Sequence, residues 1–406
     1  MNVDVAIVGG GMVGASLAVA LAPLGIQIAL IEAVPHDSSA QPSFDERTTA
    51  LSNGSRRILE ALNVWQKVGP LATPIRKIHV SDQGHFGFAR IDAAEQGLNA
   101  MGYVLANRDL GNALWARLTT SAGVRLFCPA RVSQITPGER TVALQIESGE
   151  ETPEIQARLV VAADGAHSAV RSAFGVESHV RDYDQTAIIA TVLPQRFHDN
   201  VAYERFTSEG PLALLPLEGG RCTLVLTLQS HAVPSALAWS DQEFLAEVQK
   251  RFGFRLGRFL KVGRRVSYPL FLSRAARLSS GRCVIVGNAA QGLHPIAGMG
   301  FNLGLRDVAS LAELIAERVG QPHVDPGGAD LLSQYDAWRA ADRGGVIAFT
   351  DGLVRVFANP LGAVRRLRNL GLLAFDLLPP AKAALSSLST GGGGRVPKLA
   401  RGVPLI

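Results

Sequence analysis

The sequence predicts an α/β fold with a nucleotide-binding strand–helix–strand unit, an inserted antiparallel sheet and a helical C-terminal region. Three observations predict it. A glycine-rich turn joins an apolar strand to a helix near the N-terminus, four strands of alternating character follow one another in mid-chain, and helical segments fill the C-terminal part. The 406 residues, 47% of them hydrophobic, are enough to bury a large core and suggest two or three domains.

The N-terminal segment 3–32 has the order strand, tight turn, helix, strand. Gly9, Gly11 and Gly14 have the spacing G-x-G-x-x-G, and Glu32 ends the second strand. In this arrangement the glycines permit the turn, the approach of a pyrophosphate and close packing of the helix, while the acid accepts hydrogen bonds from a ribose. The helix N-terminus adds free N–H groups that attract phosphate. We therefore expect a dinucleotide site here rather than a structural turn.

Two arginines follow this unit, and each has a functional and a structural interpretation. Arg47 precedes a helix predicted over 54–62 and capped by Ser52 or Asn53. It is either a cationic contact to a bound cofactor or, as the sequence alone favours, part of a surface salt bridge. Arg108 stands at the start of a helix, where a positive charge is unfavourable unless an anion lies near. Its position favours a contact with a phosphate or with the sugar-derived chain of a cofactor.

A second polar cluster follows a set of strands. Segments 124–128, 130–135 and 141–146 alternate like an antiparallel meander, and the buried strand 157–162 runs into Asp164. Asp164 therefore stands at the carboxyl edge of a sheet, where ligands bind in folds of this kind. The alternative for Asp164 is a helix cap without a ligand.

Four further strands are expected to form one antiparallel sheet inserted between parts of the nucleotide-binding domain. Gly-Pro and Glu-Gly-Gly segments supply turns between them. The four strands span 186–193, 201–206, 212–215 and 222–228.

The second informative stretch spans 282–307. A strand leads into a turn of small residues that contains Asn288, and a loop with Gly298 and Gly300 then leads into a helix. Small residues before a helix let backbone N–H groups converge, so this is a second anion-type site. Two such sites far apart in sequence imply one long ligand. FAD has both a pyrophosphate and an electron-rich ring and fits both sites, whereas NAD would need only the first.

The C-terminal part is helical and basic. Helices are predicted over 331–342 and 347–357, and segment 361–378 is apolar with embedded arginines. For 361–378, a helix lying on a membrane and a helix packed on the protein remain open alternatives. Residues 355–406 contain eight basic side chains and one acid, which favours contact with anionic lipid or an acidic partner. Nucleic acid is the least suitable partner, because only 6% of the residues are aromatic.

The three cysteines lie far apart without a C-x-x-C pair, so the sequence indicates neither a disulfide framework nor a metal site. The chain begins directly in a strand, without the basic region of a secretory signal. Outside the nucleotide-binding unit, no run approaches the ~20 apolar residues that span a bilayer. We expect a cytoplasmic location, with peripheral contact at the inner face of the membrane left open.

Three separated motifs now coincide: GGGMVG with Glu32, ADGAHSAVR, and GNAAQGLHPIAGMGFNLGLRD. Together they resemble, in order and over nearly the whole chain, the class A flavoprotein aromatic hydroxylases. The segments FDERTTALSNGSRRILE and YERFTSEGPLALLPL resemble those of the FAD-dependent hydroxylases of ubiquinone biosynthesis, most of all the 2-polyprenyl-6-methoxyphenol hydroxylases. The chain departs from the family at Asn288, Gln291 and Met299, where Asp, His and Gln are usual. Asn288 can still hydrogen-bond a ribityl chain, whereas Met299 could change the placement of the flavin.

The resemblance implies a Rossmann-like FAD-binding domain with an inserted antiparallel-sheet substrate domain, as in the para-hydroxybenzoate-hydroxylase-like fold, and a helical C-terminal region. The FAD-binding domain would have three parts and the substrate domain two, followed by helices and a basic tail. The parts of the FAD-binding domain would be 1–75, 106–180 and 273–345. Those of the substrate domain would be 76–105 and 181–272, and the helical C-terminal region with its basic tail would be 346–406.

The resemblance also implies a reaction. NAD(P)H, bound transiently, would reduce FAD, which would react with O₂ to give a C4a-hydroperoxide; the ring of a polyprenyl phenol would then be hydroxylated in ubiquinone biosynthesis. No second G-x-G-x-x-G indicates a stable NAD(P)H domain. Two alternatives remain open. One is an FAD-dependent lipid oxidoreductase that inserts no oxygen, and the other is a flavin-binding scaffold subunit that holds other ubiquinone-synthesis proteins together.

The motifs and the resemblance assign candidate site residues. The substrate would lie between the inserted sheet and the flavin, against a wall formed by Tyr203, Arg205, Leu215 and Tyr268. The loop residues expected nearest the chemistry are His294, Pro295, Gly298 and Gly300. No convincing general base is found, and a structural role for His294 is favoured. The residues expected to bind FAD are Gly9, Gly11, Met12, Val13, Gly14, Glu32, Arg47, Arg108, Val132, Asp164, Asn288, Pro295, Gly298, Met299, Gly300, Phe301 and Asn302.

Overall fold

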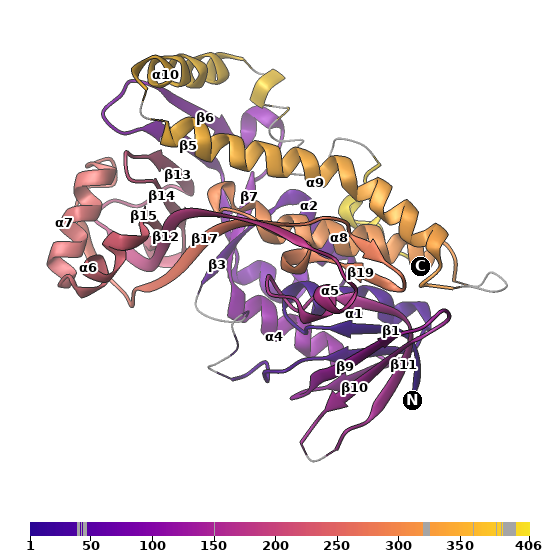
Figure 1. Cartoon of the computed structure of the whole chain (residues 1–406). Coiled ribbons are helices and arrows are strands. Elements are labelled where there is room, and N and C mark those ends of the chain that lie inside the picture. The colour runs from indigo at the N-terminus through magenta and orange to yellow at the C-terminus, as the bar shows by residue number, and fades with distance from the viewer. Residues whose placement is uncertain are drawn as a thin grey trace.

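The computed structural model describes residues 1–38, 41, 43, 47–149, 151–319, 325–359, 361–378, 380–382, 384 and 395–406. Two large sheets organise the chain, and a third sheet has only three strands; the strands of the three sheets alternate along the sequence. The long strands β12 (Ser178–Pro194) and β17 (Val266–Ala275) belong to the second sheet and run toward the first (Figure 1).

The first sheet is mostly parallel, with the strand order β18-β19-β11-β1-β2-β8 and the hairpin β9/β10 attached to β11. Its strands are β1 (Asn2–Val8), β2 (Ile28–Ile31), β8 (Val124–Phe127), β9 (Arg131–Pro137), β10 (Val142–Glu147), β11 (Glu154–Ala162), β18 (Ser279–Ser280) and β19 (Cys283–Ile285). Its helices include α1 (Met12–Leu21), α4 (Asn107–Leu118), α5 (Ala169–Ala173) and α8 (Met299–Ala316). The central strands are buried on both faces, which explains their unbroken apolar runs.

The meander predicted over 124–146 is wrong in its first strand. β8 pairs in parallel with β2, with Leu30 opposite Leu126, and only β9 and β10 form an antiparallel hairpin. The hydrogen bond from Glu32 N–H to the carbonyl oxygen of Phe127, 2.9 Å long, continues this parallel pairing to the end of β2. Alternation along β8 could not show which strand it pairs with.

The second sheet contains the four predicted antiparallel strands and extends well beyond them. Its order is β20-β17-β12-β15-β14-β13-β5-β6, with β16 paired to β12, and β13 pairs in parallel with β5. The remaining strands are β5 (Lys77–Asp82), β6 (Phe88–Asp92), β13 (Val201–Phe206), β14 (Pro211–Pro216), β15 (Cys222–Gln229), β16 (Phe259–Val262) and β20 (Gln291–Gly292). Helices α6 (Val233–Ala238) and α7 (Asp241–Phe252) lie beside this sheet (Figure 1).

The third sheet has the order β3-β7-β4, formed by Thr48–Ser52, Gly102–Ala106 and Thr73–Ile75. Helices α2 (Asn53–Ala61) and α3 (Trp65–Val68) follow β3. Ser52 is the N-cap of α2, because its hydroxyl accepts the N–H of Ser55 at 3.2 Å. This was one of the two caps expected from the sequence.

Helix α9 (Ala329–Ala358) is one helix of 30 residues, where two were expected. The gap between the two predicted helices, 343–346, contains Gly344-Gly345 and is helical as well. Arg343 holds the helix at this point, since its Nη2 atom donates to the carbonyl oxygens of Ala275 and Ala290, each at 2.8 Å. Tertiary contacts here outweigh the low helix propensity of glycine.

Helix α10 (Gly362–Leu377) packs on β5 and β6 through its polar side chains. Arg368 forms a buried ion pair with Asp82 at 2.8 Å, and Asn369 donates to the same carboxylate at 2.9 Å. The opposite side of α10 is apolar and exposed, including Leu367 and Leu370. In the described part of the chain, no helix is both long enough and apolar enough to cross a membrane.

The basic tail expected at the end of the chain, 395–406, packs on α8. Arg395 pairs with Glu313 at 2.7 Å and also with Glu317, and the N–H of Lys398 bonds to Glu313. A short 3₁₀ helix, Leu399–Arg401, then contacts α2. Part of the basic excess of the C-terminus is therefore neutralised within the protein.

Candidate active site

The first motif forms a turn too tight for a side chain. Gly9 has a φ of +104°, and a Cβ atom placed on it would stand 2.4 Å from the carbonyl oxygen of Ala163. A Cβ atom on Gly14 would stand 1.9 Å from the carbonyl oxygen of Gly9. Helix α1 therefore rests directly on the turn, in the manner that the glycine spacing predicts.

Gly11 and Glu32 complete this motif. Gly11 is the N-cap of α1, which begins at Met12, and it has no side chain that could bond the N–H groups of the first turn. Glu32 accepts hydrogen bonds from the N–H of Gly10 at 2.6 Å and from that of Val34 at 2.8 Å. Its carboxylate therefore holds the glycine turn against the end of β2. From the sequence, this same carboxylate is expected to bind a ribose.

The second motif joins the first motif to the third. One carboxylate oxygen of Asp164 accepts the N–H of Val170 at 3.2 Å, and the other accepts the hydroxyl of Ser168, the N-cap of α5. Arg171 donates from Nη1 to the carbonyl oxygen of Ala289 at 2.8 Å. Asp164 thus shapes the start of α5 while staying half-buried at the carboxyl end of β11.

The third motif packs on the first. Gly287 opens the turn 287–289, and a Cβ atom on it would come within 3.0 Å of Val13 Cγ2. A Cβ atom on Gly304 of α8 would come within 2.9 Å of the same methyl group. The side chain of Asn288, the next residue of this turn, is exposed. Helices α1 and α8, each with a glycine N-cap, therefore meet around Val13, and this pair of uncapped N-termini fits the long anionic ligand FAD.

Asn302 positions the loop before α8. Its Oδ1 atom accepts the N–H of Ser52 at 2.8 Å and the hydroxyl of Ser55 at 2.6 Å. Its Nδ2 atom donates to the carbonyl oxygens of Ala50 at 2.8 Å and Gly298 at 2.7 Å. The side chain of Asn302 thus ties the loop to the end of β3.

Other residues of this loop point in different directions. Met299, where the family usually has Gln, is 4% exposed and packs in an apolar cluster between α8 and α9. Phe301 packs against the main core. Pro295 is exposed, and a Cβ atom on Gly300 would meet nothing within 4 Å. Of these residues, Pro295 and Gly300 are the ones that leave room for a ligand.

His294 is buried at the start of the same loop. Its Nδ1 atom accepts the N–H of Ile296 at 3.3 Å, and its Nε2 atom has no partner among the described residues. The ring stands edge-on to Tyr183, with centroids 5.5 Å apart. Burial lowers the pKa of His294 to about 4, so the imidazole is uncharged at neutral pH.

The lowered pKa of His294 predicts a pH-dependent stability. Between pH 6.5 and about 4 the unfolded chain binds a proton that the folded chain excludes, so stability should be full above pH 6.5 and fall by roughly 3 kcal/mol toward pH 4. His294→Gln should lose this dependence, whereas His79, whose pKa burial also lowers to about 4, should keep its own. Urea titrations of the wild type and of His294→Gln at several pH values measure this pH dependence. The same pH dependence in the two proteins would contradict the prediction.

Arg47 lies where β3 meets the second sheet. Its guanidinium group stacks over the ring of Tyr268, 4.4 Å from the centroid. Beside it, the hydroxyls of Thr48 and Thr223 share a hydrogen bond of 2.9 Å. The structure thus brings together Arg47 and Tyr268, two of the residues expected to contact flavin and substrate.

Arg108 and Val132, two further residues expected to bind FAD, lie on α4 and β9. Arg108 is an exposed residue in the first turn of α4, next to Asn107, whose N–H bonds to the carbonyl oxygen of Arg47 at 2.8 Å. Val132 lies half-buried on β9, opposite Ile146 of β10.

The second sheet has two distinct faces. Its outer face, which carries Tyr203 and Leu214, packs on α7 in one apolar cluster. Its inner face carries Ala202, which clusters with β3 and Leu215, and Phe206, which clusters with Ile296 of the loop. The inner face is therefore the one that meets the FAD motifs.

The four residues expected to form the substrate wall divide between these faces. Leu215 and Tyr268 lie on the inner face. Tyr203 lies on the outer face against Phe252, and Arg205 bonds to the carbonyl oxygen of Arg251 in α7 at 2.9 Å. The structure thus separates Tyr203 and Arg205 from the loop. The inner-face neighbours Glu204 and Phe206 were missed, and the period of two along β13 is the signal that could have found them.

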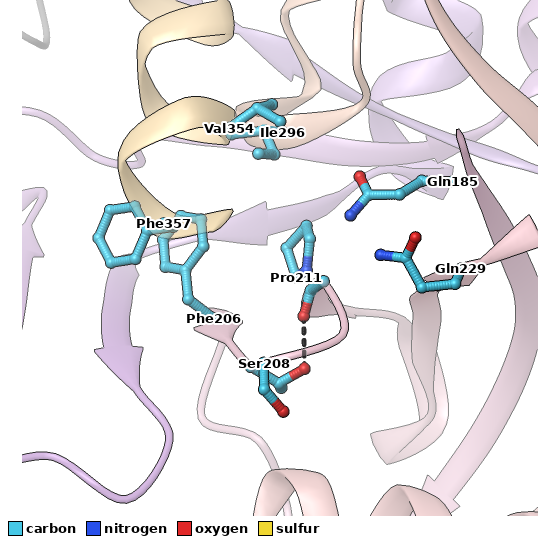
Figure 2. Close-up of a pocket in the computed structure, with 10 residues that line it drawn as sticks. Gln185, Phe206, Ser208, Pro211, Gln229, Ile296, Val354 and Phe357 are labelled. Carbon is cyan, nitrogen blue, oxygen red and sulfur yellow. Dashed lines mark hydrogen bonds between the residues drawn. The ribbon is translucent and has the colours of Figure 1, made fainter. Parts of the chain in front are cut away.

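A pocket opens at one edge of the inner face. Figure 2 shows Phe206 and Phe357 on one side of it and the amides of Gln185 and Gln229 on another. The two phenyl rings stack with centroids 3.5 Å apart. Ile296 also lines the pocket, so it lies next to the loop of the third motif.

Comparison with known proteins gives a consistent result. The family described as "FAD binding domain" matches residues 2–350. Ubiquinone hydroxylase UbiL of Rhodospirillum rubrum is 40% identical, over 99% of this chain and 93% of that protein. The 3-demethoxyubiquinol 3-hydroxylase of Escherichia coli is 32% identical, over 92% of this chain and 94% of that protein.

Among solved structures, p-nitrophenol 4-monooxygenase PnpA from Pseudomonas putida superposes with a TM-score of 0.78 at 18% identity, covering 95% of this chain and 97% of that one. At this identity the likeness shows the fold, and it confirms the predicted fold class. The motifs, their convergence on one site and the relatives agree. This chain belongs to the FAD-dependent hydroxylases of ubiquinone biosynthesis and is an FAD-dependent aromatic monooxygenase.

Proposed function

We propose that this chain uses NAD(P)H and O₂ to hydroxylate the ring of a polyprenyl phenol, of the 2-polyprenyl-6-methoxyphenol type. The observation that carries the proposal is the inner face of the second sheet, a half-buried and mostly apolar surface opposite the loop of the third motif. Such a surface suits an apolar ring held against a cofactor. The relatives named as ubiquinone hydroxylases support this substrate class.

In the proposed site, the N-termini of α1 and α8 hold FAD, Glu32 binds its ribose and Asn288 meets its ribityl chain. FAD supplies the oxygen-activating chemistry, with electrons from NAD(P)H. The residues of this chain hold the substrate ring in line with the cofactor and exclude water. On the inner face, Leu215 and Tyr268 are the members of the expected wall that suit this role.

The pocket beside Phe206 suits the first part of a prenyl chain. Phe206, Ile296, Val354 and Phe357 give one side of it an apolar lining, and it adjoins the inner face where the ring would lie. Leu372 of α10 packs against the same cluster. A chain leaving this pocket would therefore pass toward α9 and α10.

We also propose that the exposed side of α10 rests on a membrane surface, from which a polyprenyl substrate enters. This helix turns Arg368 and Asn369 toward the protein and three of its leucines outward, the reverse of an ordinary surface helix. Leu367, Leu370 and Leu377 are 68%, 55% and 77% exposed. The exposed Arg366 beside them suits anionic headgroups.

Replacing these three leucines by serine should weaken binding to anionic lipid vesicles by more than 100-fold, because each buried leucine contributes about 1.5–3 kcal/mol. Sedimentation with vesicles measures the bound fraction. Leu71→Ser, at a leucine 52% exposed outside α10, is the matched control and should bind normally. Equal binding by the triple variant would remove α10 from the membrane contact.

Mass spectrometry of lipids from cells that lack the protein tests the proposed function. Accumulation of a polyprenyl methoxyphenol with loss of ubiquinone would support the substrate and identify the ring position. Normal ubiquinone, in cells without a redundant hydroxylase, would contradict it. Complementation with a variant unable to bind FAD then separates a catalyst from a scaffold subunit, because only a scaffold would restore ubiquinone without FAD.

A further inference from the structure

A single polar side chain interrupts an apolar row across the inner face. The row runs over five strands in register: Ile189 of β12, Val225 of β15, Ala213 of β14, Glu204 of β13 and Val80 of β5. All five residues are half-buried, whereas their neighbours on the outer face of β14 and β15 are fully buried. The row therefore stays partly accessible on the inner face, and Glu204 is its one ionisable member.

The Glu204 carboxyl group has no hydrogen-bond or ion-pair partner among the described residues. Its strand neighbours across the sheet are Ala213 and Val80, which cannot donate hydrogen bonds from their side chains. Burial alone raises the pKa of Glu204 to about 7. A half-buried carboxyl in an apolar row, without a protein group to pair with, is disfavoured, so its presence beside the cofactor motifs points to a ligand that pairs with it.

Other charged and titratable groups around the inner face are engaged elsewhere. Asp82 pairs with Arg368, Arg47 stacks on Tyr268, and the hydroxyl of Tyr183 donates to Asp351 at 3.0 Å. His294 is held neutral by burial. None of these contributes to the pKa of Glu204, and none of them bonds to its carboxyl group.

We propose that Glu204 is a catalytic residue whose carboxylate binds the ring hydroxyl of the phenolic substrate and accepts its proton. This inference rests on the proposed function, because it takes the substrate to be a phenol bound against the inner face. In the step, the phenolic O–H bond breaks, the proton passes to a carboxylate oxygen of Glu204, and the electron pair remains on the ring oxygen. The step involves no redox change, and it makes the ring more electron-rich where oxygen is added. The proton is returned to solvent when the product leaves.

Three variants test this role. Glu204→Gln keeps the shape and removes the base, Glu204→Leu removes the hydrogen bond as well, and Glu218→Gln makes the same chemical change at an exposed site in the turn between β14 and β15. The first two should fold, because each removes a half-buried acid that no protein group neutralises. The folded state binds more protons than the unfolded state between pH 4.5 and about 7, so both should unfold at higher denaturant than the wild type at pH 8.5.

The rate measurement uses FAD-loaded protein and a short-chain polyprenyl phenol. Glu204→Gln should lower the rate of ring hydroxylation by about 10²–10⁴-fold, with Glu218→Gln unchanged. The wild-type rate should rise with pH through about 7, whereas that of Glu204→Gln should rise only near pH 10, where the phenol ionises unaided. A wild-type rate and pH profile in Glu204→Gln would overturn the proton-acceptor role.

A binding measurement decides recognition of the hydroxyl without catalysis. The wild type should bind the phenol about 10- to 100-fold more tightly than its methyl ether, and Glu204→Leu should bind the two equally. An undiminished preference in Glu204→Leu would overturn the proposal. If the wild type prefers the phenol yet inserts no oxygen, the proposed function fails while the contact between Glu204 and the hydroxyl stands.

Discussion

Gly11→Val should abolish FAD binding and with it the hydroxylase activity. The added side chain would cover the N-terminus of α1, where the first-turn N–H groups have no side-chain cap. Two charge-assisted hydrogen bonds to a pyrophosphate are worth about 1.5–3 kcal/mol each, so the dissociation constant for FAD should rise by more than 100-fold. The FAD content of the purified protein and a titration with FAD measure the effect.

The Gly11→Val variant should still fold, so that a loss of FAD binding reports on the binding site and not on unfolding. A Cβ atom at Gly11 would stand 2.8 Å from Ser43 Oγ, the end of a short side chain that can rotate away. At Gly14 it would meet backbone, so that glycine is a poorer choice. Gly344→Ala in α9, where a Cβ atom meets nothing within 4 Å, is the control and should bind FAD normally. Full FAD occupancy in Gly11→Val would place the pyrophosphate elsewhere.

Asp307→Asn should destabilise the protein by about 3–5 kcal/mol. Asp307 is fully buried in α8, and its carboxylate accepts the N–H of Gly287 at 3.1 Å, the amide of Gln291 at 2.8 Å and the guanidinium of Arg339 at 2.8 Å. An asparagine cannot accept all three bonds, because one of its two groups is a donor. It also removes the charge that pairs with the buried Arg339, so that Asp342 is left, among the described residues, as the charged partner of this arginine within ion-pair distance.

Denaturant unfolding of Asp307→Asn measures this loss of stability. The matched control is Asp330→Asn, which breaks an exposed ion pair with Arg318 and should cost less than about 1 kcal/mol. Because Asp307 holds the turn that begins at Gly287, FAD should also bind more weakly to the variant. Equal stability of the two variants would show that the buried network contributes little.

Local patterns explain why the nucleotide-binding unit could be predicted. The spacing of Gly9, Gly11 and Gly14 encodes a turn whose parts lie within a few residues of one another, so no long-range information is needed. The four inserted strands were found from their period of two for the same reason. Their partners were not, because the parallel pairing of β13 with β5 joins segments far apart in sequence.

Which residues of a strand face the site could not be predicted from the strand alone. In β13 both faces contain large apolar side chains, Tyr203 on one and Phe206 on the other. A shift of one residue exchanges the faces, so choosing Tyr203 and Arg205 left out Glu204 between them. Only the packing of α7 on one face and of β3 on the other separates the two choices.

Long-range polar contacts are the second kind of feature that could not be predicted from the sequence. Gln291 stands where the family usually has His, and the structure shows its amide bonded to Asp307, sixteen residues away. The continuity of α9 through Gly344-Gly345 likewise depends on Arg343, which reaches carbonyl groups at Ala275 and Ala290. Neither contact follows from local propensity.

Mass spectrometry after a reaction in ¹⁸O₂ tests ring hydroxylation most directly. Purified FAD-loaded protein would be supplied with NADPH or NADH, a short-chain 2-polyprenyl-6-methoxyphenol and labelled oxygen. The proposed function predicts one ¹⁸O atom in a new ring hydroxyl group for each substrate molecule converted. Oxidation of the nicotinamide that depends on the substrate but leaves the product without label would contradict oxygen insertion and favour a lipid oxidoreductase.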